Sequence, residues 1–380
     1  MVPGIFIILL FYAAGEFIGT LTGGLIPGSV IGMILLFAAL CGKVVKPETV
    51  RPVARFLTDN MGLFFLPAGV GIVNAMDILS QSWQAVLTAC AVSTVAVIVT
   101  VACTQEWLES RSRRRAAKTR TVSHPPPPRR RSTRYRHGST RGRNQRHQTM
   151  NPLLHSEIFI LTLVTGVYLA ALWLYRKTRL SLLHPLLVSI PVLALGIRFL
   201  GIPFATFEAG SRIINFLLGP TVVALGYLLY EQREHLKANG ISILTSVFVG
   251  SVIGIVSVVL IARWMGADRT LIASLEPKSV TTPIAMSIAQ RSGGIPAIAA
   301  VVVIVVGIFG GIVGPFILDR LGIRSRIARG LALGSAAHGL GTARAMELGA
   351  IEGAISGLAI GVMGIMTAIL VPVIEWLLNL

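Results

Sequence analysis

Long apolar runs, separated by short polar segments, are the feature of this chain that most restricts how it can fold. The 380 residues are 53% hydrophobic and only 13% charged. Apolar runs of about 20 residues predict transmembrane helices, because a helix of that length spans a bilayer core of about 30 Å. The chain is therefore predicted to be an all-α polytopic membrane protein with about ten spanning helices. This composition argues against a soluble enzyme.

The first 105 residues are predicted to form a four-helix membrane domain, with spans at 4–22, 25–42, 61–80 and 84–104. Basic residues lie between the second and third spans, and the positive-inside rule places this loop in the cytoplasm. The N-terminus and the segment after residue 105 should then be cytoplasmic as well. Glu16 lies inside the first span, where helix packing, proton binding and an interfacial position all remain open. The basic residues of the loop are Lys43, Lys46, Arg51 and Arg55.

Residues 106–150 account for most of the formal net charge of +18, since they hold fourteen Lys or Arg and two Glu. They also contain four consecutive prolines at 125–128 and no apolar periodicity, which predicts a disordered basic linker. A nucleic-acid arm is one interpretation of the charge. In a membrane protein a solvated tether that touches anionic lipid is the better one, so lipid and not nucleic acid is the expected partner.

The second half, residues 151–380, is predicted to contain six further spans. Its basic loops fall on one side of the membrane if residues 270–290 enter and leave the bilayer on the same face. Placing these loops inside requires residue 156 to start outside, which conflicts with a cytoplasmic linker. Either one span is miscounted or the two halves were once separate chains. The six spans lie near 156–175, 182–200, 213–230, 241–263, 295–318 and 350–378.

One polar segment, Glu276 to Pro283, lies between the apolar runs 241–262 and 295–318. Each of its two prolines removes a backbone donor and tends to break a helix. A charged side chain at bilayer depth costs at least about 2.5–3.5 kcal/mol, so such residues usually face a cavity and serve a function. A loop at the membrane surface is the alternative. We favour an interrupted or re-entrant helix.

A second polar segment follows at residues 335–347. If it is helical, Ser335, His338 and Thr342 share one face, because they are spaced i, i+3 and i+7. Gly339 and Gly341 weaken the helix there and would let a ligand approach the backbone. Two interpretations of His338 are equally open. It is either a core histidine with a satisfied hydrogen bond or a ligand-binding histidine.

Two interrupted helices in the same half are typical of a transporter site, since broken helices expose amide groups and positive dipole ends near the bilayer midplane. The available donors suit a small carboxylate with a neighbouring hydroxyl or keto group. No metal-ligand spacing is present, so no metal and no cofactor are expected. The candidate substrate-binding residues are Glu276, Lys278, Ser279, Thr281, Thr282, Ser335, His338, Gly339, Gly341, Thr342 and Arg344.

The two halves resemble two known membrane families. Residues 152–380, with EPKSVTTPIA at 276–285 and AAHGLGTAR at 336–344, resemble the LrgB/CidB family. Residues 1–105, with LIPGSVIGM at 25–33 and FFLPAGVGI at 64–72, resemble the LrgA/CidA family. A single chain with both is similar in plan to the plastid glycolate/glycerate transporters of plants. Because no transit peptide is evident, the bacterial inner membrane is the expected location.

The resemblance implies two functions of different classes. One is carriage of small monocarboxylates such as glycolate, glycerate or pyruvate, with a proton or in exchange. In that case 151–380 would be the transport domain and 1–105 a scaffold that makes a homo-oligomer, most simply a dimer. The other is a holin-like or antiholin-like pore or regulator of murein hydrolase activity and lysis. Dense polar groups at two broken helices favour the carrier, because a lesion-forming protein needs no such site.

Overall fold

The computed structural model describes residues 1–23, 26–117, 156–178 and 183–379, and this part of the chain contains helices and no strand. Seven of its helical runs are long and apolar enough to cross a membrane, and two shorter apolar helices accompany them. The chain is therefore a multi-pass, all-α membrane protein, as the sequence predicts. The first half forms α1 (Val2–Leu21), α2 (Gly28–Cys41), α3 (Pro47–Asp59), α4 (Met61–Val70), the 3-10 turn η1 (Gly71–Ala75) and α5 (Met76–Ala117).

The predicted spans at 61–80 and 84–104 follow each other in the structure without a loop and are separated by a kink. α4 ends at Val70, η1 follows, and α5 begins at Met76 with non-helical dihedral angles at Ser82 (φ −120°, ψ 16°). By length and composition, residues 61–111 form one candidate membrane run of 51 residues. This is about twice the length that one crossing needs, and the kink at Ser82 falls between the two predicted spans.

The basic loop between the second and third predicted spans contains an amphipathic helix, α3. Its apolar face is buried through Val50, Val53, Ala54 and Leu57. On the opposite face Arg55 donates a hydrogen bond of 2.8 Å to Glu231 at the end of α10. The helix forms because apolar residues recur every third or fourth position in this segment.

The predicted linker also begins later than expected. α5 continues past residue 105 to Ala117, so the expectation of disorder from residue 106 was wrong for residues 106–117. Residues with good helix propensity, such as Glu106, Leu108 and Glu109, continue the helix beyond the apolar run. Glu109 accepts a hydrogen bond from Ser325, which ties this end of α5 to the second half. The rest of the predicted linker, residues 118–150, lies outside the described residues.

The described part of the second half supplies eleven further helices, with a short break after α12 and a kink inside α15. Between α12 and α13 the backbone turns at Glu276–Thr281, inside the first polar segment. The helices are α6 (Glu157–Thr178), α7 (Pro185–Phe199), α8 (Phe204–Gly210), α9 (Arg212–Phe216), α10 (Leu218–Glu231), α11 (Arg233–Trp264), α12 (Arg269–Leu275), α13 (Thr282–Arg291), α14 (Pro296–Arg320), α15 (Arg326–Leu348) and α16 (Ala350–Leu378).

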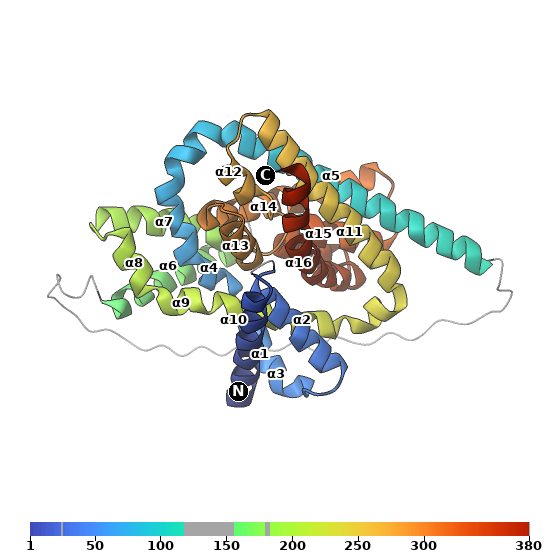
Figure 1. The fold of residues 1–380 in the computed structure, drawn as a ribbon, viewed down its shortest axis with the longest axis horizontal. Coiled ribbons are helices and arrows are strands. Elements are labelled where there is room, and N and C mark those ends of the chain that lie inside the picture. The colour runs from blue at the N-terminus through green and yellow to red at the C-terminus, as the bar shows by residue number, and fades with distance from the viewer. Residues whose placement is uncertain (24–25, 118–155, 179–182, 380) are drawn as a thin grey trace.

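The two halves share their hydrophobic cores. One core joins α2 and α5 to α10–α16, and the other joins α1–α4 to α6–α10. In Figure 1, α5 lies along α11 on one side of the molecule, while α4 lies among α6, α7 and α9 on the other. Close packing of side chains across these shared cores joins the two halves, since van der Waals contacts stabilise helix association in a membrane.

Glycines of the first two helices are used for packing within the chain. A Cβ on Gly15 would lie 2.2 Å from the carbonyl oxygen of Gly28, and one on Gly32 would lie 2.6 Å from that of Phe11. The backbones of α1 and α2 therefore approach closely, as small residues allow in membranes. The predicted dimer contact in residues 4–42 would have to use the opposite, exposed face of α1, which carries Phe6 and Phe17.

Candidate functional site

The first break is built by proline and by short-range backbone bonds. α12 ends at Leu275, and Pro277 offers no amide to continue it. Two turns replace the helix, with Lys278 N–H donating to Leu275 (3.1 Å) and Val280 N–H to Pro277 (3.3 Å). α13 then starts after Thr281, with Pro283 in its first turn, where the missing amide costs nothing. The sequence prediction of an interrupted helix at this segment is confirmed.

The polar side chains of this break are all buried. Lys278 is 1% exposed, and its ammonium donates a hydrogen bond of 3.0 Å to the neighbouring Ser279 hydroxyl. The Thr281 hydroxyl is buried and has no hydrogen-bond partner among the described residues. Thr282 is buried beside it at the start of α13. The segment is therefore no surface loop of the protein.

A pairing of Glu276 with Lys278 in the empty protein does not form. None of the ion pairs between described residues includes either side chain. The intervening Pro277 fixes the turn so that the two side chains leave it separately. Lys278 is thus a buried ammonium that donates a hydrogen bond to a neutral hydroxyl. A buried cation of this kind is costly unless an anion or a further set of acceptors is supplied.

The second break falls on His338 and not on the glycines that follow it. His338 has φ 38° and ψ −124°, a conformation near the first central position of a type II′ turn, which glycine usually occupies. The predicted continuous face of Ser335, His338 and Thr342 is therefore wrong, because the helix is interrupted at its middle member. A strained non-glycine residue in a buried segment points to a functional constraint.

The His338 ring is held by the neighbouring helix α14. Its Nε2 lies 2.9 Å from the Val303 carbonyl oxygen, and because a carbonyl only accepts, Nε2 carries the hydrogen of this bond. A Cβ on Gly307 would lie 2.6 Å from the ring, so glycine is required for the ring to fit. Ser335, one turn earlier, is buried and its hydroxyl has no partner in the described part of the chain.

The remaining candidates of the second segment do not join this buried set. Gly339 is exposed, while Gly341 is buried against the Leu333 carbonyl, where a Cβ would lie 2.1 Å away. The Thr342 hydroxyl lies 2.8 Å from that of Ser356 on α16. Arg344 is exposed and forms an ion pair with Glu347. Gly341 and Thr342 thus have packing contacts that account for their presence.

α14 and α5 bring the two breaks into one region. α14 packs against both α12 and α15, and α5 packs against α12, α14 and α15. The charge of Lys278 lies close enough to the His338 ring and to the Cys90 thiol on α5 to interact electrostatically with both. The two polar segments therefore form one constellation, whose buried members are Glu276, Lys278, Ser279, Thr281, Thr282, Ser335 and His338.

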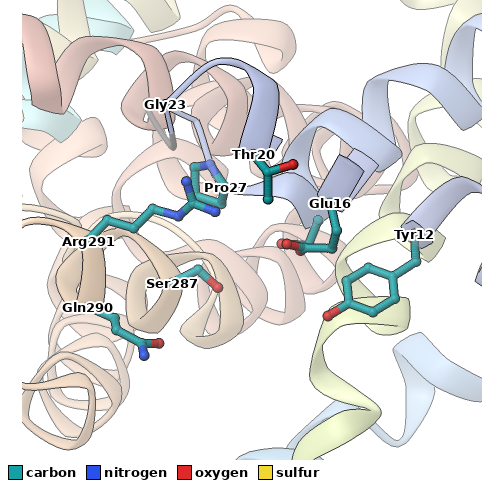
Figure 2. A pocket seen from close by; sticks show the side chains of 9 residues that line it. Tyr12, Glu16, Thr20, Gly23, Pro27, Ser287, Gln290 and Arg291 are labelled. Atoms are coloured by element: carbon teal, nitrogen blue, oxygen red, sulfur yellow. The ribbon is translucent and has the colours of Figure 1, made fainter. Parts of the chain in front are cut away.

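A polar pocket of about 610 Å³ lies between the two halves, at the other end of α13. Figure 2 shows Tyr12 and Glu16 entering it from α1, and Ser287, Gln290 and Arg291 from α13. α13 has 10 residues, so about 15 Å separate this pocket from the break at its start. The sequence singled out Glu16 and left its role open; the structure places it in this pocket.

Several residues of this region were missed by reasoning from the sequence. Arg291 and Ser287 lie outside the motif, and nothing local distinguishes them. Glu375 lies on α16 next to the Glu276 carboxyl and also lines a smaller cavity near Arg291. A carboxylate at the end of the apolar run 350–378 was the signal that could have identified Glu375, since ionisable residues in spans are rare.

These features define a multi-pass membrane protein in which one half holds two interrupted helices at a buried polar site. Residues 162–377 match the LrgB-like family, and residues 12–105 match the LrgA family. The chain belongs to the LrgB-like family over more than half of its length and carries an LrgA domain before it. The resemblance of both halves is confirmed.

Relatives of the second half come from several bacteria. The uncharacterized protein YxaC of Bacillus subtilis (strain 168) is 36% identical over 223 residues, which is 59% of this chain and 97% of that protein. An uncharacterized protein of Haemophilus influenzae is 35% identical over 217 residues, or 57% and 94% of the two chains. The antiholin-like protein LrgB of Bacillus mycoides is 37% identical over 194 residues, or 50% and 83%. No solved structure matches the chain significantly.

Proposed function

We propose that this protein is a carrier for small monocarboxylates, of the size of glycolate, glycerate or pyruvate, in the inner membrane of a bacterium. The observation that carries the proposal is Lys278, an ammonium that is 1% exposed and has no carboxylate partner among the described residues. A substrate carboxylate would supply the missing anion. A charge-assisted hydrogen bond of this kind is about twice as strong as a neutral one.

The surroundings of Lys278 also favour an anion with a second polar group. The N-terminal end of α13 begins at Thr281 and adds a positive dipole end. The hydroxyls of Thr281 and Ser335 lack partners and could bind a substrate hydroxyl or keto oxygen. Because both hydroxyls are buried, leaving them unpaired costs free energy that a bound substrate would recover.

Access to this buried site requires movement, which is consistent with a carrier and not with an open channel. The pocket of about 610 Å³ between α1, α2 and α13 is the polar opening at the far end of α13. Arg291 in its wall offers a first contact to a carboxylate. α13 runs from this wall to the break, so a shift of α13 would connect the pocket with the buried site at the break. In this arrangement the LrgA half forms one wall of the substrate path.

Uptake into proteoliposomes tests the proposal. The purified full chain should accumulate labelled glycolate or pyruvate, and unlabelled substrate inside the vesicles should accelerate this uptake by exchange. A dicarboxylate such as succinate should not compete, since one ammonium and a few hydroxyls match a single carboxylate. Absence of both net uptake and exchange for every small monocarboxylate, in vesicles shown to contain correctly oriented protein, would disprove the carrier.

A holin-like role is the second candidate, because relatives of the second half are named antiholin-like proteins. A lesion would release molecules of many sizes, whereas a carrier discriminates. The same vesicles loaded with a fluorescent dye much larger than glycolate separate the two roles. Dye release that rises with protein density would favour the pore, and retained dye together with glycolate uptake would favour the carrier.

A further inference from the structure

Glu276 is the buried charged group of the site that substrate binding does not explain. It lies directly after α12 and is 2% exposed, and neither of its carboxyl oxygens has a hydrogen-bond donor among the described residues. A carboxylate would repel the carboxylate substrate proposed above. Its burial inside an anion site therefore calls for a separate account.

A second carboxyl group lies beside that of Glu276. Glu375, on α16, lies within hydrogen-bond reach of the Glu276 side chain. As two ionised carboxylates, both groups only accept, which is why neither Glu276 oxygen finds a donor. One proton between them changes this, since a carboxylic acid then donates to a carboxylate. Carboxyl groups placed side by side in this way share a proton because both cannot easily be ionised.

The charged groups around the pair come from three elements. On α12 the Arg269 charge acts on Glu276, and on the break itself Lys278 follows two residues later. On α13, Arg291 lines the same cavity as Glu375. Neither Arg269 nor Lys278 donates a hydrogen bond to the Glu276 carboxyl in the described part of the chain. The proton is thus the group that satisfies the Glu276 carboxyl.

Water can reach the pair from one side. A cavity of about 180 Å³ is lined by Glu375, Arg291 and Pro372, and it shares Gly23, Pro27 and Arg291 with the larger pocket between the two halves. Glu375 is half-buried at this cavity while Glu276 is closed off behind it. Glu375 therefore stands between this cavity and the buried Glu276 carboxyl.

We propose that the Glu276–Glu375 pair is a proton-binding site of this protein. The proton comes from water in the cavity, sits between the two carboxyl oxygens, and returns to water when it leaves. The effect of this site on substrate binding rests on the proposed carrier function. A pair without its proton adds negative charge to the break, two residues before Lys278, and disfavours a substrate anion there. Proton binding should therefore raise substrate affinity, and substrate binding should raise proton affinity equally.

Infrared difference spectra test the proton site without relying on transport. Full-length protein in lipid vesicles should show a protonated-carboxyl C=O band that disappears between acidic and alkaline buffer. Glu276→Gln and Glu375→Gln should each remove or shift this band, because the proton is shared. Glu347→Gln, at an exposed residue paired with Arg344, should leave it unchanged. A band that both site variants leave intact would overturn the proposal.

Glycolate transport then separates this inference from the carrier function. In wild-type vesicles an inward proton gradient should accelerate uptake, while in Glu276→Gln and Glu375→Gln uptake should stay at the level without a gradient and exchange should persist. Gradient-driven uptake that survives in both variants would overturn the proton site and leave the carrier intact. Stimulation by a sodium gradient instead of a proton gradient, lost in the variants, would also overturn it. A shared-proton band in a protein that moves no monocarboxylate would uphold the site and disprove the carrier.

Discussion

The two helix breaks perform the same task by different chemistry. At the first break, Pro277 and Pro283 interrupt the helix, the backbone closes in hydrogen-bonded turns, and no residue from 276 to 281 has a positive φ. At the second, no proline is present, and the helix is interrupted by His338 with φ 38°. The first break is therefore relaxed in its backbone, and the second is strained.

The hydrogen bonding of the polar side chains shows the opposite difference, since it is more complete at the strained break. The strained residue His338 has its ring nitrogen satisfied by the Val303 carbonyl at 2.9 Å, so its side chain helps to hold the conformation. At the relaxed break, the Lys278 ammonium is hydrogen-bonded to the neighbouring Ser279 hydroxyl and to no carboxylate among the described residues. The proposed carrier function assigns different roles to the two breaks: the first binds substrate through its charge, and the second holds its conformation through its side chain. Substitutions at four positions test this distinction.

Lys278→Met should have the largest effect on transport. Loss of one charge-assisted contact to a carboxylate costs on the order of 1.5–3 kcal/mol, or roughly ten- to a hundred-fold in affinity. The half-saturating glycolate concentration in vesicle uptake measures this, with thermal stability in detergent unchanged or raised. Lys237→Met is the matched control, since the Lys237 side chain is 72% exposed. Unaltered affinity in Lys278→Met would mean that the substrate binds elsewhere.

Gly307→Ala should disturb the second break through packing alone. The new methyl would lie 2.6 Å from the His338 ring and displace it from the Val303 carbonyl. Overpacking of this kind costs about 1–3 kcal/mol, so the melting temperature in detergent should fall and uptake should slow. Gly311→Ala on the same helix meets its nearest atom at 3.6 Å and should be neutral or slightly stabilising. Equal effects of the two variants would show that contact with the His338 ring is not the cause.

His338→Gly and His338→Ala separate strain from side-chain bonding. Both lose the hydrogen bond to Val303, worth about 1 kcal/mol, but only glycine relieves a positive φ that costs about 1–3 kcal/mol. The glycine variant should therefore melt at a higher temperature than the alanine variant. Both should impair uptake less than Lys278→Met. A deeper loss of substrate affinity in both than in Lys278→Met would make His338 the main ligand.

Thr342→Val should have the smallest effect and should act on stability alone. Its hydroxyl is paired with Ser356 at 2.8 Å, which joins α15 to α16. Removing this bond should lower the free energy of unfolding by about 1 kcal/mol and leave the half-saturating glycolate concentration unchanged. Ser356→Ala should cost a similar amount, and the double variant little more, because the two hydroxyls form one bond. Weaker substrate affinity would return Thr342 to the binding site.

The sequence by itself determined the features that rest on local chemistry. Apolar runs predicted a multi-pass helical protein, since the length needed to span a bilayer is a property of each run. The break at Glu276–Thr281 followed from Pro277 and Pro283, which act on the backbone wherever they stand. The polarity of residues 335–347 indicated the second interruption. Gly339 and Gly341 suggested a position for it just after His338, where the structure places it.

Three features depend on residues far apart in the sequence and emerge from the tertiary structure alone. His338 adopts a positive φ because α14 supplies the Val303 carbonyl and the space at Gly307, and neither can be inferred from the helix that bends. The helical run at 61–104 bends because its two ends pack into different cores. Glu276 meets Glu375 across ninety-nine positions of the sequence because α13 packs against α16. Helical periodicity reports which face of one segment is apolar, whereas these contacts are set by how several segments fill space together.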